Sequence, residues 1–492
     1  MTGTGLNFAG ELLSRCSPSS TITDATSGRA FGVDEPLGIA VARAAAELRD
    51  RGLAPGQRFV LVCDVSAAAN LYYLGAIYAG VVVTPVDPVQ AARSLNDIVE
   101  SADADLVLST TNRFRPTEPL PRGRIEVLAD PTSSEPLAEA HPVAGDTVAA
   151  LMPTSGTTGA PRLVMTSHDN LLANTSAIVE SQRLTEADRA MLILPTAYCF
   201  GVSVLQSHLW AGGSVVVDGR FMFPDKVLQA IAEHRCTTFA GVPTTYKILL
   251  GRSNLRSIPL PGLVRLVQAG GPLSVAEIEE VIDAVGERDF YVMYGQTEAT
   301  ARITTLDPAH RRRKLGSVGR PLNHVEVEIR DDNGALPRGE PGEVCVRGRS
   351  VAAGYFRDKA GTDAVFEDGW LHTRDHGRMD AEGFIWIESR AQEFLKIAGR
   401  RVSLREAEET ASAIEGVREV VACGTEHAET GDALALFFVP CEGAEAEEVA
   451  TTIARALPKY WNCQIVAPIE AVPLNARGKV DRAALAERLA ES

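Results

Sequence analysis

The 492-residue sequence lacks the features that mark secreted and membrane-bound proteins. Its eight cysteines are scattered, with no CxxC pair or other metal-ligand spacing, which favours a reducing compartment over a disulfide framework. No apolar run approaches the roughly 18 residues that a membrane-spanning helix needs. Residues 1–15 lack the basic region and apolar core of a signal peptide. We therefore expect a cytoplasmic protein that does not enter a membrane.

An excess of positive charge is also absent. The formal net charge is −16, so the chain is unsuited to wrapping nucleic acid or docking on an anionic membrane surface. Apolar residues make up 45% and charged residues 23% of the chain, which are ordinary proportions for a globular protein. We find no internal repeat and no low-complexity tract. A chain of this length predicts two or three domains.

Helix-like and strand-like segments alternate over the first half of the chain. Short apolar runs such as Arg58–Cys63 and Thr238–Gly241 are typical of buried strands, while Leu37–Arg51 and Asn170–Ser181 have the length and pattern of helices. This alternation indicates parallel sheets covered by helices on both faces. After about Leu315, short strands separated by turns predict a small β-rich subdomain.

A second change in composition predicts a domain boundary further along the chain. Ser403 and Glu406 have the spacing of a capping box that opens a helix. The strands and helix that follow predict a compact α+β unit of about a hundred residues, enough for a core of its own. We therefore predict an α/β N-terminal domain of layered, parallel-rich sheets over residues 1–389, a hinge at 390–393 and a small mobile α+β domain over 394–492.

A loop rich in serine, threonine and glycine follows a predicted strand. It reads Thr154-Ser155-Gly156-Thr157-Thr158-Gly159-Ala160-Pro161-Arg162. Small residues let the backbone approach a phosphate, hydroxyl and N–H groups donate to it, and Arg162 adds positive charge. The loop is not a Walker loop, because no GxxxxGK[ST] is present. Taken alone, such a cluster can equally be a plain turn.

The loop resembles the phosphate-loop signature of the adenylate-forming superfamily, which includes acyl-CoA synthetases, peptide-synthetase adenylation domains and luciferases. Downstream, Tyr294-Gly295-Gln296-Thr297-Glu298 is similar to the family's Tyr-Gly-x-Thr-Glu. The resemblance implies that Tyr294 stacks on adenine, Thr297 contacts the phosphates and Glu298 helps to hold Mg²⁺, a hard cation that prefers carboxylate oxygens. Between these motifs, Ala269-Gly270-Gly271-Pro272 resembles the loop that lines the adenine and the acyl pocket.

Two further segments extend the resemblance towards the end of the chain. Thr373-Arg374-Asp375 and Ser389-Arg390 stand where the family has Thr-Gly-Asp and Gly-Arg, and the residue before each of Asp375 and Arg390 departs from the pattern. The resemblance implies that Asp375 and Arg390 bind the ribose hydroxyls, for which a carboxylate is a directional anchor.

The last segment resembles the family's Gly-Lys-x-Asp-Arg and contains Lys479. The resemblance implies that this lysine reaches the adenylation site, where an ammonium and Mg²⁺ stabilise the charge that develops during attack on the α-phosphorus. The predicted catalytic residues are thus Lys479, Glu298 and Thr297, with Glu298 as the metal ligand and with ATP and Mg²⁺ as cofactors. The predicted nucleotide-binding residues are Thr154, Ser155, Gly156, Thr157, Thr158, Gly159, Arg162, Gly270, Gly271, Tyr294, Asp375 and Arg390.

The stretch Leu194–Ser203 is predicted to line the acid-binding pocket. Amino-acid-activating relatives have an Asp about where Gly201 stands, and that Asp pairs with the substrate's ammonium. A buried ammonium without a partner costs on the order of several kcal/mol, so we do not expect an α-amino acid as substrate. An aromatic or medium apolar acid fits the predicted pocket better, although each pocket residue can equally be core packing. The predicted pocket residues are Tyr198, Phe200, Gly201, Val242, Tyr246 and Met293.

The acyl acceptor is predicted from the hinge and from one glycine. Gln392 stands where the family has a pivoting Asp or Lys, and Gly399 matches the glycine that lets a pantetheine arm pass. This implies transfer to a thiol, either of CoA or of the phosphopantetheine on a separate carrier protein. The alternatives are an amide synthetase, which uses an amine, and a nucleotide-binding relative without activity. Because no carrier domain follows Lys479, we expect a freestanding enzyme.

Overall fold

A computed structural model describes residues 5–112, 114, 125–131, 134–154, 161–331, 333–390, 394–397, 400–427, 431–474, 480–482 and 484–485. The chain divides into two compact units. The first comprises Met1–Val327 and Cys345–His372, and the second comprises Glu328–Val344 and Thr373–Ser492. The domain boundary at 390–393 stays a prediction, since residues 391–393 lie outside the described ones.

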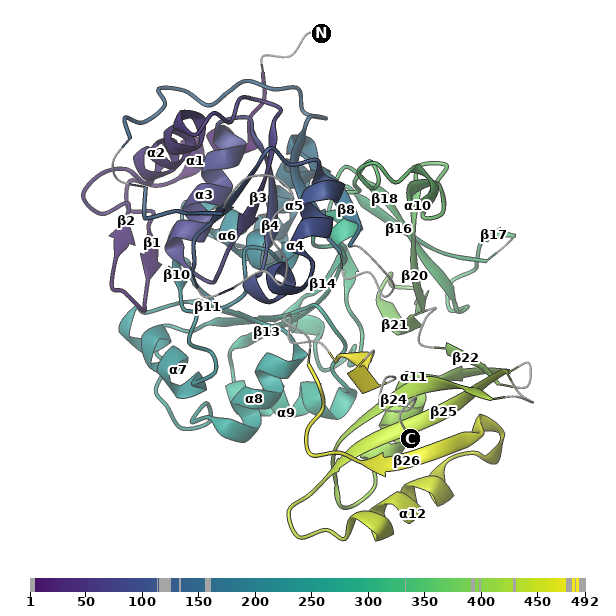
Figure 1. The fold of residues 1–492 in the computed structure, drawn as a ribbon. Coiled ribbons are helices and arrows are strands. Elements are labelled where there is room, and N and C mark those ends of the chain that lie inside the picture. Colours follow the sequence, from purple (N-terminus) through teal and green to yellow (C-terminus); the bar gives the residue numbers. More distant parts are fainter. Residues whose placement is uncertain are drawn as a thin grey trace. The chain divides into compact units, whose positions relative to one another are not determined.

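Parallel-rich sheets form the framework of the first unit (Figure 1). One has the strand order β15 (Arg320–Pro321), β14 (Thr304–Leu306), β13 (Asp289–Tyr294), β12 (Arg265–Gln268), β11 (Thr238–Gly241), β9 (Arg189–Leu192), β10 (Ser214–Val217), β1 (Ile22–Asp24) and β2 (Ala30–Phe31). Its strands run parallel from β13 to β1. The pairs β13–β14, β14–β15 and β1–β2 are antiparallel. The predicted parallel sheet is therefore confirmed.

The other sheet of this unit has the order β6 (Glu126–Val127), β5 (Leu106–Ser109), β3 (Arg58–Val62), β4 (Val82–Val86), β7 (Val148–Pro153) and β8 (Leu163–Ser167). Only β8 among these strands is antiparallel to its neighbour. Every residue of β4 is buried, as expected of a strand covered on both faces.

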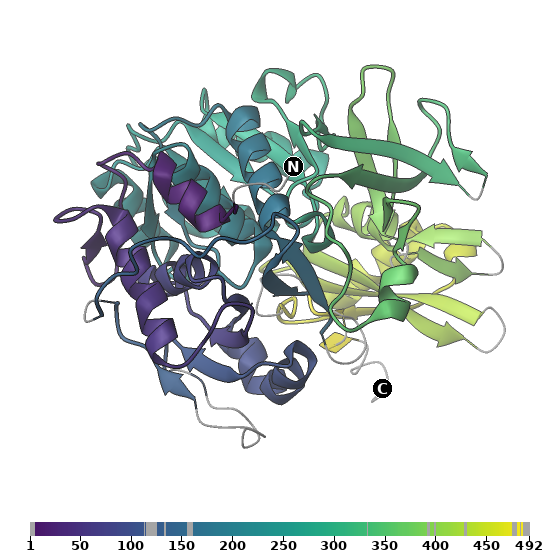
Figure 2. The same cartoon turned by 90° about the horizontal axis from the view of Figure 1, so that it is seen from above.

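Helices flank both sheets (Figure 2). They are α1 (Phe8–Arg15), α2 (Leu37–Asp50), α3 (Ala67–Tyr78), α4 (Pro88–Ala102), α5 (His168–Gln182), α6 (Cys199–Trp210), α7 (Pro224–Glu233), α8 (Pro243–Arg252) and α9 (Val275–Val285), with the short α10 (Lys359–Asp363) and the 3₁₀ helices η1 (Thr297–Ala299) and η2 (Pro308–His310). Every residue of α6 is buried, because the helix is apolar on nearly all sides. Such a helix has no amphipathic period, which explains why the sequence pattern did not predict it.

The β-rich region has the strand order β17 (Gly334–Ala335), β16 (Val325–Asp331), β18 (Gly342–Gly348), β20 (Trp370–Met379) and β19 (Phe366–Glu367), with β21 (Ile385–Arg390) paired to β20. The predicted short strands of this region are confirmed. The ladder between β20 and β21 places Asp375 directly opposite Arg390.

The C-terminal part is the predicted α+β unit. Its sheet has the order β23 (Arg400–Ser403), β22 (Phe394–Ile397), β25 (Gly431–Pro440) and β24 (Val417–His427), with β26 (Cys463–Pro468) parallel to β25. The helices are α11 (Leu404–Ser412), α12 (Ala446–Ala456) and the 3₁₀ helix η4 (Lys459–Trp461). Leu436 and Phe438 on β25 pack with Ile453 of α12 and Trp461 in a core of their own. Within the described part of the chain, no helix is both long and apolar enough to cross a membrane.

Candidate active site

The predicted phosphate loop connects β7 with β8. Its central residues, Ser155, Gly156, Thr157, Thr158 and Gly159, lie outside the described residues. The base of the loop is described: the Thr154 N–H donates to the Arg162 carbonyl over 2.9 Å, next to the antiparallel pair of Pro153 and Leu163. The two strands thus hold Thr154 and Arg162 side by side at the carboxyl end of β7.

The Tyr294–Glu298 motif forms the turn that follows β13. A Cβ on Gly295 would lie only 1.9 Å from the carbonyl oxygen of Ala301, so only glycine allows the chain to fold back this closely. Tyr294 ends the strand, and Thr297 and Glu298 lie in η1. The motif therefore stands at the carboxyl end of a parallel strand, which is where open α/β sheets bind ligands.

Tyr355 connects this motif to the end of the phosphate loop. Its hydroxyl donates to Glu298 Oε1 over 2.7 Å, although the residues are 57 positions apart in the chain. The Arg162 guanidinium lies 5.3 Å from the centre of the same ring, and Arg162 Nε donates to Asp358 over 3.0 Å. The structure thereby brings together a predicted phosphate-binding cation and the predicted metal ligand. No local pattern marks Tyr355, because only tertiary packing puts it here.

Glu298 retains an oxygen that fits a metal ion. Tyr355 donates to Oε1, and Oε2 has no hydrogen-bond donor among the described residues. A carboxylate held by one hydrogen bond with its second oxygen available is a suitable ligand for a hard cation such as Mg²⁺.

Several predicted pocket residues meet at the start of α6. Gly270 has a φ of +87°, and a Cβ there would lie 2.2 Å from the Tyr198 hydroxyl and 3.2 Å from a methyl group of Val242. The rings of Tyr198 and Phe200 pack edge to face with centroids 6.2 Å apart. The Cys199 Sγ lies 3.6 Å from the Thr297 hydroxyl. This apolar, aromatic group therefore borders the predicted nucleotide site.

Tyr246 and Met293 have other surroundings. The Tyr246 hydroxyl donates to the Val267 carbonyl over 2.8 Å, and its ring packs edge to face against Phe239 and Phe290. These contacts are those of a core residue, and its role in the pocket stays a prediction. Met293 contacts the buried Arg302. The sequence motifs did not identify Arg302 as a site residue, although a single arginine among small and apolar residues was a signal that could have done so.

The predicted ribose-binding pair lies in the second unit. Asp375 is only 2% exposed, and its backbone N–H donates to the Thr373 hydroxyl over 3.1 Å. Arg390 stands opposite it across the β20–β21 ladder. Arg374 has a φ of +59°, in the left-handed region where glycine is preferred. This chain therefore adopts with arginine a backbone conformation that favours glycine, the residue that the family resemblance leads one to expect at this position.

Comparison with known proteins bears on both parts of the chain. Residues 37–356 match the model of a family described as AMP-binding enzyme. The chain belongs to this family. Residues 406–479 match the AMP-binding enzyme C-terminal domain. The prediction that the chain is an adenylate-forming ligase is confirmed.

Several curated proteins and solved structures are similar to nearly the whole chain. Feruloyl-CoA synthase of Amycolatopsis sp is 28% identical over 448 residues, covering 89% of this chain and 90% of the relative. The ATP-bound structure of MatB from Rhodopseudomonas palustris superposes with a TM-score of 0.86 at 26% identity, covering 98% of this chain and 99% of the other. The amide bond synthetase McbA from Marinactinospora thermotolerans gives a TM-score of 0.80 at 26% identity with the same coverage.

Besides the centre of the phosphate loop, three further residues that the family resemblance singled out lie outside the described residues. They are the catalytic lysine Lys479, the hinge residue Gln392 and the acceptor-channel residue Gly399. Their roles stay predictions.

The backbone around Gly201 leaves no space for a side chain that could pair with a substrate's ammonium group. A Cβ on Gly201 would lie 2.5 Å from the Pro195 carbonyl oxygen and 3.0 Å from that of Leu194. Both atoms belong to the backbone and cannot move aside cheaply. The position therefore has no room for an Asp side chain.

We expect Gly201→Ala to lower the free energy of unfolding by about 1–3 kcal/mol, the usual range for an overpacked site. Gly251→Ala is the matched control, because a Cβ on Gly251 in α8 would meet nothing within 4 Å. That substitution should leave stability unchanged or raise it by about 0.4–1 kcal/mol. Urea unfolding of both variants checks this, and equal stability of the two would contradict the steric reading of Gly201.

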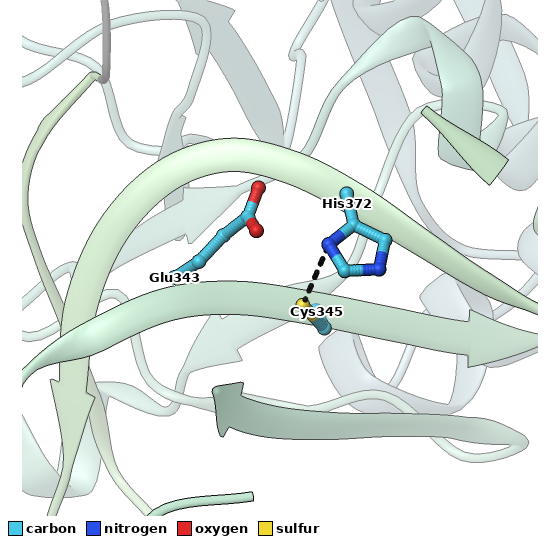
Figure 3. A group of neighbouring side chains, drawn as sticks. All are labelled: Glu343, Cys345 and His372. Carbon is cyan, nitrogen blue, oxygen red and sulfur yellow. Dashed lines mark hydrogen bonds between the residues drawn. The ribbon is translucent and has the colours of Figure 1, made fainter. Parts of the chain in front are cut away.

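A cluster of metal-binding residue types outside the predicted site is drawn in Figure 3. Cys345 Sγ on β18 and His372 Nδ1 on β20 are 3.5 Å apart, and Glu343 lies two residues before Cys345 on the same face of its strand. Glu343 accepts the Arg374 N–H over 2.9 Å, and His372 Nε2 lies 3.9 Å from Glu367. Ordinary protein contacts thus account for these side chains, and we assign no metal to them.

Proposed function

We propose that this AMP-binding enzyme activates a carboxylic acid other than an α-amino acid as an acyl-adenylate and then transfers the acyl group to a thiol. The observation that carries the first step is the arrangement of Arg162, Tyr355 and Glu298 beside the Tyr294–Glu298 turn. Binding of ATP requires a cation for the phosphates, a carboxylate oxygen for Mg²⁺ and an aromatic ring for adenine. Arg162, Glu298 and Tyr294 are proposed to supply these groups in that order.

Each group has a proposed part in adenylation. The acid's carboxylate oxygen forms a bond to the α-phosphorus of ATP, and pyrophosphate leaves with the electrons of the broken bond. Glu298 would hold Mg²⁺, which when bound would supply positive charge to neutralise the phosphates. Thr297 donates its hydroxyl to the phosphates, and Asp375 with Arg390 holds the ribose. Lys479 stabilises the charge that develops on the bridging oxygens.

The pocket residues support an aromatic or medium apolar acid. Tyr198 and Phe200 are the chain neighbours of Cys199, whose sulfur lies near the Thr297 hydroxyl, and Val242 lies with Tyr198 close to Gly270. Gly201 has no side chain to bind an ammonium. Feruloyl-CoA synthase, a relative of nearly full-length coverage, is named for an aromatic acid. Both points favour acids with an apolar body over amino acids.

Pyrophosphate exchange with ATP across a panel of acids tests the first step. We expect aromatic and medium apolar acids to exceed every proteinogenic amino acid, because a desolvated ammonium would have no partner in the pocket. Higher exchange with a free α-amino acid would overturn the substrate class, and no exchange with any acid would overturn the adenylation itself.

A thiol is the proposed acceptor, either of CoA or of a carrier protein's phosphopantetheine. A thiolate is a good nucleophile towards an acyl-adenylate and needs positioning more than a general base. Sulfur attacks the acyl carbon, and AMP leaves. Feruloyl-CoA synthase is named for a thioester product, whereas McbA is named for an amide bond, so an amine is the competing acceptor.

We expect Gly399→Trp to block thioester formation by roughly 10²-fold or more while leaving pyrophosphate exchange intact, because a bulky side chain would obstruct the channel through which a pantetheine arm passes. In the measurement, CoA, a holo-carrier protein or one of a panel of amines is added to the enzyme with its bound acyl-adenylate. The products are identified by their mass. If only amines react and Gly399→Trp leaves their reaction untouched, the thiol proposal is wrong.

A further inference from the structure

Arg302 is a fully buried arginine that contacts the predicted acid pocket. Its side chain is 1% exposed. Its guanidinium lies 5.0 Å from the centre of the Phe200 ring, Nη2 donates to Ser203 Oγ over 3.3 Å, and Nη1 donates to the Met293 sulfur. Phe200 and Met293 both belong to the predicted pocket.

The backbone of Arg302 is held firmly. Its N–H donates to Asn174 Oδ1 over 3.3 Å, and its carbonyl accepts from Asn174 Nδ2 over 2.8 Å. Asn174 is a buried residue of α5. The backbone of Arg302 is therefore fixed, and its side chain lies among residues of the predicted pocket rather than at the surface.

The positive charge of Arg302 has no counter-charge among the described residues. A guanidinium has five N–H donors, yet its acceptors here are a hydroxyl and a thioether, and Nε has none. Burial lowers the pKa of Arg302 to about 10, which still leaves it charged at neutral pH. Buried charges are normally paired, because desolvation of a lone ion is costly.

A second buried arginine of the same unit, Arg265, is paired with a carboxylate, although its Nε, like that of Arg302, has no acceptor among the described residues. Arg265 donates to the Asp188 carboxylate over 2.9 Å and to the Thr238 hydroxyl over 2.8 Å. The contrast identifies the missing component around Arg302 as an anionic acceptor. The Met293 sulfur is a weak acceptor on a flexible side chain, so a ligand oxygen can take its place.

We propose that Arg302 forms a subsite for a second anionic group of the acid, a carboxylate or a sulfonate at the far end of an apolar body. The inference rests on the proposed function and deepens it, since the first carboxylate must face the nucleotide site. Cys199 contacts Thr297, and Ser203 contacts Arg302. Cys199 and Ser203 are four positions apart on α6, or about 6 Å along the helix axis. An acid lying along this helix would therefore have about one aromatic ring between its two anionic groups.

The test compares acids of similar shape and different charge. Benzene-1,4-dicarboxylate and 4-sulfobenzoate carry the second anion, and 4-methylbenzoate is their neutral counterpart. We expect kcat/KM of pyrophosphate exchange in the unmodified enzyme to favour the dianions by roughly tenfold or more. In Arg302→Met the ratio of dianion to neutral acid should fall by at least that factor, through KM, and Arg302→Lys should restore part of it.

Ligand-induced stabilisation gives a readout besides activity. Each dianion should raise the Tm of the unmodified enzyme and not that of Arg302→Met. If 4-methylbenzoate exchanges while the dianions neither exchange nor raise the Tm, the subsite is wrong and the proposed function stands. If the dianions raise the Tm only when Arg302 is present but no acid exchanges, the subsite stands and the proposed function fails. A dianion preference that survives Arg302→Met, or no response to any acid in either assay, overturns the subsite.

Discussion

Lys479→Ala is expected to slow acyl-adenylate formation by roughly 10²–10³ or more, the scale of losing one preorganised electrostatic contact to a transition state. Lys479 stands in a Gly-Lys-x-Asp-Arg segment, and a lysine ammonium offsets the charge that develops when two anions react. Backbone contacts join the described residues before and after this segment: Leu474 pairs with Val480, and the Asp481 N–H donates to the Pro473 carbonyl over 2.8 Å.

The two half-reactions separate this role from a general loss of structure. Transfer to the thiol from a preformed acyl-adenylate should stay largely intact in Lys479→Ala, because we expect that step to use a rotated C-terminal domain that no longer presents Lys479 to the reacting groups. Lys459→Ala, in η4 of the same part of the chain, is the control and should leave both rates unchanged. Equal losses in both half-reactions would rule out the assignment of Lys479 to adenylation.

Glu298→Gln is the other substitution with a large expected effect. We expect pyrophosphate exchange to fall by roughly 10²–10³, because the amide retains an acceptor for the Tyr355 hydroxyl but loses the negative charge that holds Mg²⁺. The half-saturating Mg²⁺ concentration should rise as well. Exchange rates measured over a Mg²⁺ titration check both parts.

Tyr355→Phe is the matched control for Glu298. It removes the hydroxyl that donates to Glu298 Oε1 and keeps the carboxylate, so the loss should be about that of one neutral hydrogen bond, roughly tenfold or less. Its Mg²⁺ dependence should resemble that of the unmodified enzyme. If Glu298→Gln and Tyr355→Phe behaved alike, the carboxylate would act by positioning Tyr355, and its assignment as a metal ligand would be wrong.

Local patterns in the sequence were enough for the fold class and the family. The strand Thr238–Gly241 was predicted, and the helix predicted over Leu37–Arg51 is observed as Leu37–Asp50, because burial on a strand or one helical face leaves a periodic apolar signal. The loop starting at Thr154 and the motif ending at Glu298 were recognisable because the residues predicted to surround the phosphates and the metal ion lie close together in the chain. Helix α6 was missed, since a helix buried on all sides has no period.

Tertiary structure alone decided which of these residues meet. The hydrogen bond from Tyr355 to Glu298 spans 57 positions, and the approach of Arg302 to Phe200 and Ser203 depends on how β13, β14 and α6 pack. The same packing placed Tyr246 in an aromatic core cluster and closed the space beside Gly201. Sequence spacing determines neighbours within a strand or a helix, whereas contacts between elements depend on sheet order and on close packing, which no local pattern records.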